Sequence, residues 1–262
     1  MSKEAVFAIL TRVGFISRGL LYIAIAVLVI FLGKAASAEG ALAFIGDGIG
    51  QWMLVVIAVG FAAYGLWRLA DAAFGTEHPG DGNKALVKRA GAGASGLVHL
   101  FLAYTTADIA NGTSAESGGA DRQAQMVLEL PGGQLLLAAV ALGLAIAAIV
   151  QFARASKCSF LSDLVPEARR SAVKWLGRVG YFARGIVFVV VAYFLMTAAI
   201  DHESWKAGGT EQLFTWLSRP LSLGVAAGLF LFGLYGLVEA WYRNIHTPDI
   251  DGLAAEARSH VT

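Results

Sequence analysis

The chain has 262 residues, of which 57% are hydrophobic and only 15% are charged, and its formal net charge is +1. Soluble domains carry about 25% charged residues, so this composition favours a membrane protein. The near-neutral charge gives no reason to expect a nucleic-acid partner. The single cysteine, Cys158, excludes an internal disulfide bond, and the five histidines show no metal-ligand spacing, so we expect no metal site and no cofactor.

Six apolar stretches approach the length of about 20 residues that a helix needs to cross a bilayer. In chain order, the expected spans are Phe15–Gly33, Ile49–Ala70, Ala90–Ala107, Gly132–Ala153, Val179–Ile200 and Leu221–Ala240. None of them shows the alternation of barrel strands, and unpaired backbone groups are not tolerated in lipid, so each is expected to be a helix. The expected fold is therefore an all-α polytopic membrane protein with six transmembrane helices.

The basic residues indicate which side of the membrane each link faces. If the chain starts in the cytoplasm, all but four of the 20 Lys and Arg residues fall on the cytoplasmic side; the exceptions are Lys34, Arg122, Lys206 and Arg219. Because cytoplasmic links are enriched in Lys and Arg, we place both termini in the cytoplasm and the protein in a bacterial cytoplasmic (inner) membrane. We expect no removable signal peptide, a solvated cytoplasmic link over Lys157–Lys174 and a flexible cytoplasmic tail over residues 246–262.

The six spans form three similar pairs. The first span of each pair opens with the frame Arg-x-Gly-x-x-x-(Arg/Ser)-Gly, which reads RVGFISRG at residues 12–19, RAGAGASG at 89–96 and RVGYFARG at 178–185. The second spans also align, and they read GFAAYGLWRLAD at 60–71, GLAIAAIVQFAR at 143–154 and GLFLFGLYGLVE at 228–239. Each pair is expected to be a helical hairpin that starts in the cytoplasm, so the repeats are parallel.

These pairs define three repeats within a single membrane domain over residues 1–262. Repeat 1 covers residues 10–76, repeat 2 covers 87–156 and repeat 3 covers 176–245, and a pseudo-threefold arrangement of the hairpins is the expected architecture. The outer link of each hairpin contains a short apolar piece, at Ala41–Ile45, Met126–Leu130 and Leu213–Leu217. Each piece is expected to form a short helix at the membrane surface.

The repeated hairpin resembles a bacterial membrane family catalogued as domain of unknown function 1206, whose members carry a two-helix unit three times. The resemblance covers residues 10–245 and depends on the two Arg-Val-Gly openings, at residues 12 and 178, and on the glycine-rich second spans. It implies the architecture described above and brings no activity, substrate or catalytic residue. The middle repeat departs from the pattern, because Ser95 stands where the other two repeats have arginine.

Five charged residues that could form intramembrane ion pairs fall inside the expected spans or directly at their ends, where an unpaired charge is costly. Arg18 and Arg184 lie about 9 Å along the helix beyond Arg12 and Arg178, at the same position of repeats 1 and 3. Asp71 and Glu239 close the second spans of these repeats, where repeat 2 has Arg154. We predict structural ion pairs within repeats 1 and 3, namely Arg18 with Asp71 and Arg184 with Glu239, and an acid for Arg154 from another repeat. An anion or lipid-headgroup site at the cytoplasmic face is the alternative.

His99 is expected near the middle of the bilayer, about 15 Å inside its span. Ser95, His99 and Thr106 share one face of the helix, and Tyr22 occupies the position of His99 in repeat 1. This polar stripe is either a proton or solute path, since histidine changes charge near neutral pH, or a packed face that holds a neutral histidine.

The sequence leaves three functions open. With few polar groups inside the spans and no nucleophile beside a base, the protein is expected not to be an enzyme. We expect a scaffold or accessory protein that binds lipid, a protein partner or a second copy of itself. A small channel or transporter is the alternative, and it needs a wet path along the pseudo-axis past His99. A lipid-modifying enzyme needs a cluster of carboxylates or histidines at one interface, which the sequence does not offer.

Overall fold

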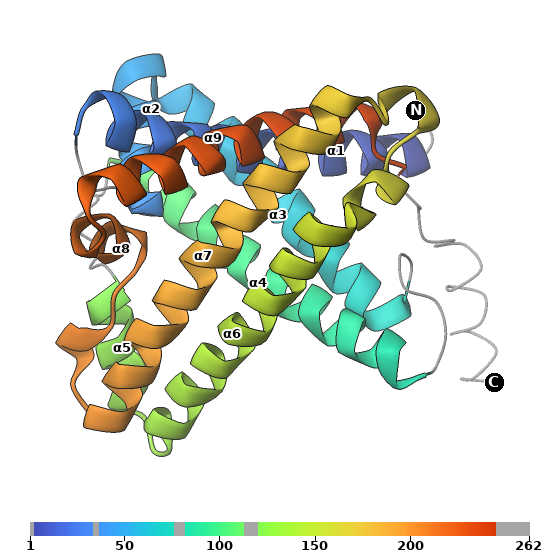
Figure 1. Cartoon of the computed structure of the whole chain (residues 1–262). Coiled ribbons are helices and arrows are strands. Elements are labelled where there is room, and N and C mark those ends of the chain that lie inside the picture. The colour runs from blue at the N-terminus through green and yellow to red at the C-terminus, as the bar shows by residue number, and fades with distance from the viewer. Residues whose placement is uncertain (1–2, 34–36, 76–81, 113–119, 245–262) are drawn as a thin grey trace.

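The computed structural model describes residues 3–33, 37–75, 82–112 and 120–244 (Figure 1), so the expected tail over 246–262 lies outside the described residues. The six long helices are α1 (Lys3–Phe31), α3 (Gln51–Phe74), α4 (Asn83–Ala110), α6 (Gly133–Lys157), α7 (Ser171–Asp201) and α9 (Arg219–Tyr242). The links hold the short helices α2 (Ala38–Ile49), α5 (Ala120–Leu128) and α8 (Thr210–Trp216), and the 3-10 helices η1 (Ser159–Asp163), η2 (Pro166–Ala168) and η3 (Ser204–Lys206). The expected all-α class is confirmed.

Local signals in the sequence determine where several of these helices begin and end. The Ser37 hydroxyl accepts a hydrogen bond of 3.0 Å from the Gly40 amide and so caps the start of α2. Gly75 ends α3 in the left-handed conformation, with a φ of 67°, which glycine adopts without strain. Gly50, with a φ of 107°, makes the sharp turn between α2 and α3.

Five of the described helices are long and apolar enough to cross a membrane: α1 from Thr11 onward, α3, α6, α7 and α9. The expected third span, Ala90–Ala107, lies in α4, which is comparable in length but is not among the five. The stretch 90–107 carries no Lys, Arg, Asp or Glu, but its glycines and its polar residues Ser95, His99 and Thr106 lower its hydropathy. The protein is thus a multi-span membrane protein, and the sixth span stays a prediction.

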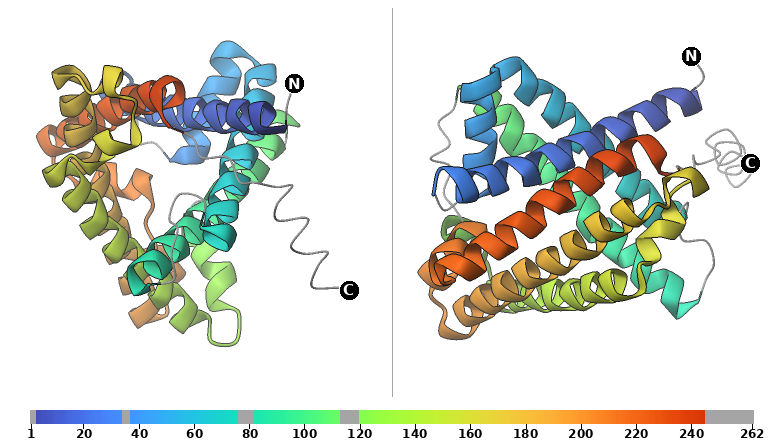
Figure 2. Two further views of the ribbon diagram at one scale, coloured as in Figure 1. Left: turned by 90° about the vertical axis from the view of Figure 1, so that its right-hand side faces the viewer. Right: turned by 45° about the horizontal axis from the view of Figure 1, so that its top comes forward.

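The long helices pack in a cyclic order that runs from one repeat to the next. The second helix of each repeat makes its most extensive contact with the first helix of the following repeat: α3 packs on α4, α6 on α7 and α9 on α1. These three pairs form the sides of a triangular outline (Figure 2, left). Within repeats, α1 also packs on α3 and α7 on α9, whereas α4 and α6 make no extensive contact. The ring of helices is therefore closed at repeats 1 and 3 and open at repeat 2.

The short helices gather at one end of the ring. In Figure 1, α2, α5 and α8 lie on the left, whereas the start of α1, the end of α9 and the link between α6 and α7 lie on the right. A short helix is present in each link where one is expected, although α5 begins and ends earlier than the expected piece. The start of α1 and the end of α9 therefore lie at the same end of the bundle, as three hairpins with the same orientation require.

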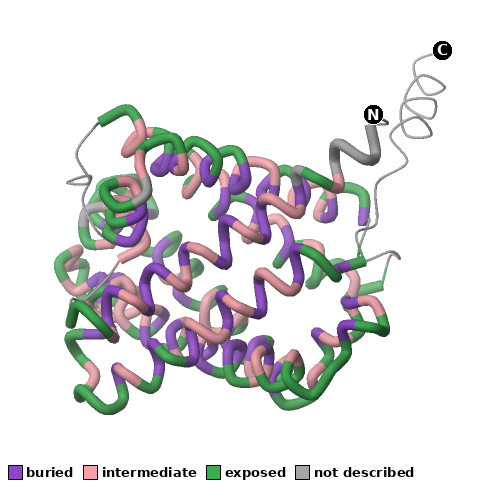
Figure 3. Tube along the Cα trace, turned by 90° about the horizontal axis from the view of Figure 1, so that it is seen from above, coloured by how far each residue is buried: buried purple, intermediate pink, exposed green. Residues whose placement is uncertain are grey.

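One apolar cluster fills the ring at the end nearest α2 and α8. It joins side chains from α1, α2, α3, α7, α8 and α9, and Leu102, Ala103 and Ile109 of α4 pack against it. Buried positions lie along the sides where the helices face one another (Figure 3). Small residues permit close approach between helices, because a Cβ atom at Gly19 would lie 2.9 Å from the Gly233 carbonyl oxygen across the α1–α9 contact.

The link between α6 and α7 is a packed cap, so the expectation of a solvated linker is wrong. Phe160 in η1 is fully buried and its ring contacts those of Tyr181 and Tyr235. The Val165 amide donates to the Tyr242 carbonyl at 2.9 Å and ties the link to the end of α9. The charged residues of this link surround a small apolar core, which composition alone does not reveal.

Candidate functional site

Two arginines of the repeated frame hold consecutive repeats together at the end of the bundle opposite the short helices. Arg12 donates to the carbonyls of Ala240 at 2.6 Å and Trp241 at 2.8 Å, at the end of α9. Arg89 donates at 2.9 Å to the Ala72 carbonyl, which is the equivalent acceptor at the end of α3. Both arginines thus satisfy carbonyls that a helix end leaves unpaired.

Arg18 is the centre of a buried polar network between α1, α3 and α9. Its guanidinium donates to the Tyr64 hydroxyl at 2.9 Å and forms an ion pair with Glu239. Glu239 also accepts a hydrogen bond of 2.9 Å from Arg243. Arg18 is 7% exposed and Glu239 is 1% exposed, so solvent screens neither charge. Such a pair is stable only while both partners are present, since either charge alone is costly to bury.

The predicted pairing of the interior arginines with acids of their own repeats is wrong. Glu239 pairs with Arg18 and not with Arg184, because α9 packs extensively on α1. Asp71, which is fully buried, pairs with Arg68 of its own helix at 3.3 Å. The prediction assumed that each hairpin is a closed electrostatic unit, whereas the cyclic packing brings together charges of consecutive repeats.

Arg154 takes its acid from the link that follows repeat 2, and not from another repeat as predicted. Its guanidinium pairs with Asp163 of η1 at 2.8 Å and donates to the Tyr181 hydroxyl at 3.2 Å. Asp163 also pairs with Arg243 at 3.3 Å. This carboxylate therefore joins α6, the packed link and the end of α9.

Arg184 differs from these arginines because aromatic rings surround its charge. Its guanidinium carbon lies 4.7 Å from the ring centre of Phe188, 5.1 Å from that of Phe232 and 5.7 Å from that of Tyr22. Within the described parts of the chain, Arg184 forms no ion pair and no hydrogen bond, and its Nε atom is buried without a partner. The rings stabilise the charge, but they leave the hydrogen-bond donors of the guanidinium unused.

His99 packs on aromatic side chains of α3. Its ring centre lies 4.4 Å from that of Tyr64 and 6.0 Å from that of Phe61, and the residue is 5% exposed. Its Nδ1 atom lies 2.7 Å from the Ser95 carbonyl oxygen one turn earlier. The hydroxyl of the fully buried Thr106 donates at 2.5 Å to a carbonyl of its own helix. These local hydrogen bonds favour the interpretation of the polar stripe as a packed face.

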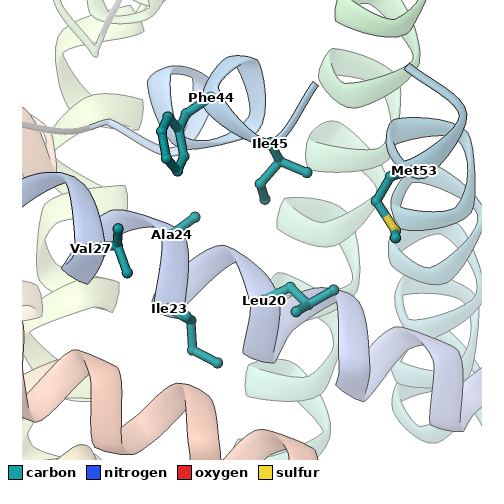
Figure 4. A pocket seen from close by; sticks show the side chains of 7 residues that line it. All are labelled: Leu20, Ile23, Ala24, Val27, Phe44, Ile45 and Met53. Carbon is teal, nitrogen blue, oxygen red and sulfur yellow. The ribbon is translucent and has the colours of Figure 1, made fainter. Parts of the chain in front are cut away.

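An apolar pocket of about 150 Å³ lies between α1, α2 and α3. Figure 4 shows the side chains that line it: Leu20, Ile23, Ala24 and Val27 of α1, Phe44 and Ile45 of α2, and Met53 of α3. These side chains offer no acid, base or nucleophile. The pocket is therefore suited to a hydrocarbon group and not to chemistry.

The three-hairpin pattern is found in a known protein family. The family described as Domain of Unknown Function (DUF1206) matches residues 13–75, 90–157 and 179–243. The chain belongs to this family. The three DUF1206 segments fall on α1–α3, α4–α6 and α7–α9, so each contains two long helices and the short helix between them. The resemblance seen in the sequence is confirmed.

This DUF1206 chain is similar to a bacterial protein, the uncharacterized protein YxxB of Bacillus subtilis (strain 168). The two are 28% identical over 250 residues, which cover 89% of this chain and 90% of that relative. No solved structure matches the chain. The family and the relative support a multi-span membrane protein with a bacterial homologue.

Proposed function

We propose that this protein is a non-enzymatic scaffold or accessory protein that binds lipid or a partner within a bacterial cytoplasmic membrane. All six long helices cross the bilayer as three parallel hairpins with pseudo-threefold symmetry, and both termini face the cytoplasm. The distribution of Lys and Arg supports this orientation, because these residues concentrate at the end of the bundle where α1 starts and α9 ends.

The apolar filling of the ring is the observation that carries this proposal. The cluster near α2 and α8 joins six helices, and a hydrocarbon plug of this kind opposes the passage of ions. At the other end, the charges of Arg18 and Glu239 form a buried ion pair, and those of Arg154 and Asp163 form a partly exposed one. Catalysis needs a nucleophile, acid or base that is free to meet a substrate, so these pairs favour a structural role.

The polar residues of α4 are compatible with a position in the membrane. His99 and Thr106 are buried inside the bundle, whereas Leu97, Val98 and Phe101 are exposed on the surface of α4. A helix whose polar groups face other helices and whose apolar groups face outward is suited to lipid. We therefore include α4 as the sixth span.

Cysteine labelling tests this topology. In a Cys158→Ser background, cysteines introduced for Asn83 and Gln125 flank α4, and both positions are exposed. If α4 crosses the bilayer, a membrane-impermeant maleimide is expected to label Gln125→Cys in intact spheroplasts and Asn83→Cys only after permeabilisation. Ser218→Cys and Ser162→Cys, at opposite ends of the bundle, are the outer and cytoplasmic reference positions. Equal labelling of Asn83→Cys and Gln125→Cys in intact spheroplasts would show that α4 does not cross the bilayer.

A flux measurement separates the scaffold from the channel. Proteoliposomes that contain the purified chain are expected to leak protons and small ions no faster than protein-free vesicles, because the apolar cluster near α2 and α8 offers ions no polar path. His99→Phe, which copies Phe188 of repeat 3, is expected to change nothing. A flux that the wild-type chain supports and His99→Phe abolishes would establish the channel and overturn the scaffold.

A further inference from the structure

Arg184 lacks the acid that its counterpart Arg18 has. Both residues occupy the same position of the repeated frame. Arg18 bonds to Tyr64 on the second helix of its own repeat, and to Glu239 on the helix that precedes it in the cyclic packing. These two partners define what the repeated architecture supplies to an arginine at this position: one hydroxyl and one carboxylate.

The two equivalent positions around Arg184 hold no acceptor. Phe232 replaces the tyrosine and offers a ring without a hydroxyl, at 5.1 Å from the guanidinium carbon. Arg154 replaces the acid, and its own charge is paired with Asp163. Arg184 is thus a cation inside a span that meets only aromatic rings among the described residues, with a buried Nε donor unused. Such a charge favours an anion that the chain itself does not provide.

The ring of helices is open one helix away from α7, which carries this charge. The opening lies between α4 and α6, and α6 packs on α7. A Cβ atom at Gly91 of α4 or at Gly143 of α6 would meet nothing within 4 Å. At the equivalent Gly14 of repeat 1, a Cβ atom would lie 2.5 Å from that of Tyr64 across the α1–α3 contact. Repeat 2 therefore has the glycines that allow close helix packing in repeat 1, but its two long helices do not pack extensively on each other.

The edges of this opening are apolar and lack large inward side chains. Ala147 of α6 stands where repeats 1 and 3 have aromatic residues. Val98 shares the Gly91 side of α4, two turns further along, and Val140 and Ile146 share the Gly143 side of α6 one turn away; all three valine and isoleucine side chains are exposed. Hydrocarbon is the environment that such a surface requires.

We propose that Arg184 binds the phosphate of an anionic phospholipid whose acyl chains lie in the opening between α4 and α6. The phosphate supplies the acceptor oxygens that Tyr64 and Glu239 supply to Arg18, and a guanidinium can bond two of these oxygens at once. A phospholipid satisfies both features together, because its charge meets Arg184 while its chains cover the apolar edges. The inference rests on the proposed function, and it gives the lipid-binding scaffold a ligand class and a location.

The position of Arg184 along α7 agrees with a lipid from the cytoplasmic leaflet. Arg184 lies nearer the start of α7 than its end, and the start is at the cytoplasmic side of the proposed topology. A headgroup can be drawn below the bilayer surface where a protein thins the membrane locally.

Lipid binding to the full chain in a neutral detergent tests the proposal. Native mass spectrometry is used to titrate phosphatidylglycerol, and phosphatidylcholine and inorganic phosphate serve as the neutral-lipid and free-anion probes. We expect phosphatidylglycerol to bind and the other two to bind weakly or not at all. Arg184→Gln is expected to weaken phosphatidylglycerol about tenfold or more, since a hydrogen-bonded charge is lost. Arg178→Gln, on the same helix, is the matched control and is expected to keep the wild-type affinity.

A second variant tests the path of the acyl chains. Gly143→Trp places a bulky side chain at the edge of the opening and is expected to weaken the binding of phosphatidylglycerol while Arg184 is intact. Equal binding of inorganic phosphate, with no effect of Gly143→Trp, would replace the lipid by a free anion. Wild-type affinity in both Arg184→Gln and Arg184→Lys would overturn the site, whereas the labelling and flux results decide the proposed function separately.

The melting temperature without added lipid shows whether a variant loses lipid binding only because it is less stably folded. Arg18→Gln is expected to lower it, because that change breaks a buried ion pair. Arg184→Gln is expected to leave it unchanged or higher, because no ion pair or hydrogen bond to a described residue is lost. A drop in Arg184→Gln as large as that in Arg18→Gln would assign Arg184 a structural role and overturn the proposal.

Discussion

Replacing Glu239 with glutamine is expected to lower the free energy of unfolding by about 3–5 kcal/mol, because it leaves buried arginines without their acid. Glu239 is 1% exposed and accepts from both Arg18 and Arg243. Glutamine has nearly the same volume as glutamate, so the loss reports the charge and not the packing. Thermal melting of wild type and variant in one detergent measures the effect as a lower melting temperature.

The exposed pair of Asp201 and Lys206 provides the control for this change. Its atoms lie 2.8 Å apart, a geometry as good as that of the buried pairs, but 43% and 29% of the two side chains are exposed. Solvent-exposed pairs contribute about 0–1 kcal/mol, so Asp201→Asn is expected to change the melting temperature little. If the melting temperatures of the two variants fall equally, burial does not explain how much the Arg18–Glu239 pair contributes to stability.

Replacing Gly60 with alanine is expected to lower the free energy of unfolding by about 1–3 kcal/mol, because the new methyl group has no room. Its Cβ atom would lie 2.2 Å from the Ser17 hydroxyl and 2.9 Å from the Val13 carbonyl oxygen. The hydroxyl can rotate, but the carbonyl belongs to the backbone of α1. The helices α1 and α3 must therefore move apart, and a lower melting temperature in detergent is the measurement.

Gly143 offers a matched control at the equivalent position of repeat 2. A Cβ atom there would meet nothing within 4 Å, so Gly143→Ala is expected to keep or raise the melting temperature. Alanine in a helix interior is favoured over glycine by about 0.5–1 kcal/mol. A loss at Gly143 as large as the loss at Gly60 would mean that α4 and α6 are closed against each other as α1 and α3 are.

Features that depend on local sequence are predictable here, and features that depend on contacts between repeats are not. Apolar length and the repeated frame predict the long helices and the three-hairpin organisation, and short apolar pieces predict the helices of the outer links. The packed link around Phe160 is not predictable, since one buried ring among many charges reverses the expectation of a solvated segment. The open side of repeat 2 is not predictable either, because Gly143 has the pattern of a packing glycine.

The candidate site shows the same division. The depth of Arg18 and Arg184 in their spans marks them as interior charges, and both have aromatic neighbours inside the bundle. Their partners are not predictable from the sequence, because the sequence gives the order of the helices but not which helices pack together. Arg12 and Arg89 are visible in the repeated frame, yet their role as helix caps requires the carbonyls of another repeat. Asp163 lies in a link, where a solvated carboxylate is the usual finding.

The contact between α1 and α9 has a consequence for biogenesis. Arg12 reaches its acceptor on Ala240 across 228 positions of sequence, so the ribosome delivers the donor long before the acceptor exists. Arg18 is likewise synthesised long before Glu239, the acid with which it pairs. Until α9 is inserted, a nascent chain therefore holds Arg12 without these carbonyl acceptors and Arg18 without its acid, although Tyr64 is already present. Insertion of that helix supplies both partners, so a chain truncated before α9 keeps Arg12 and Arg18 without their acceptors on α9.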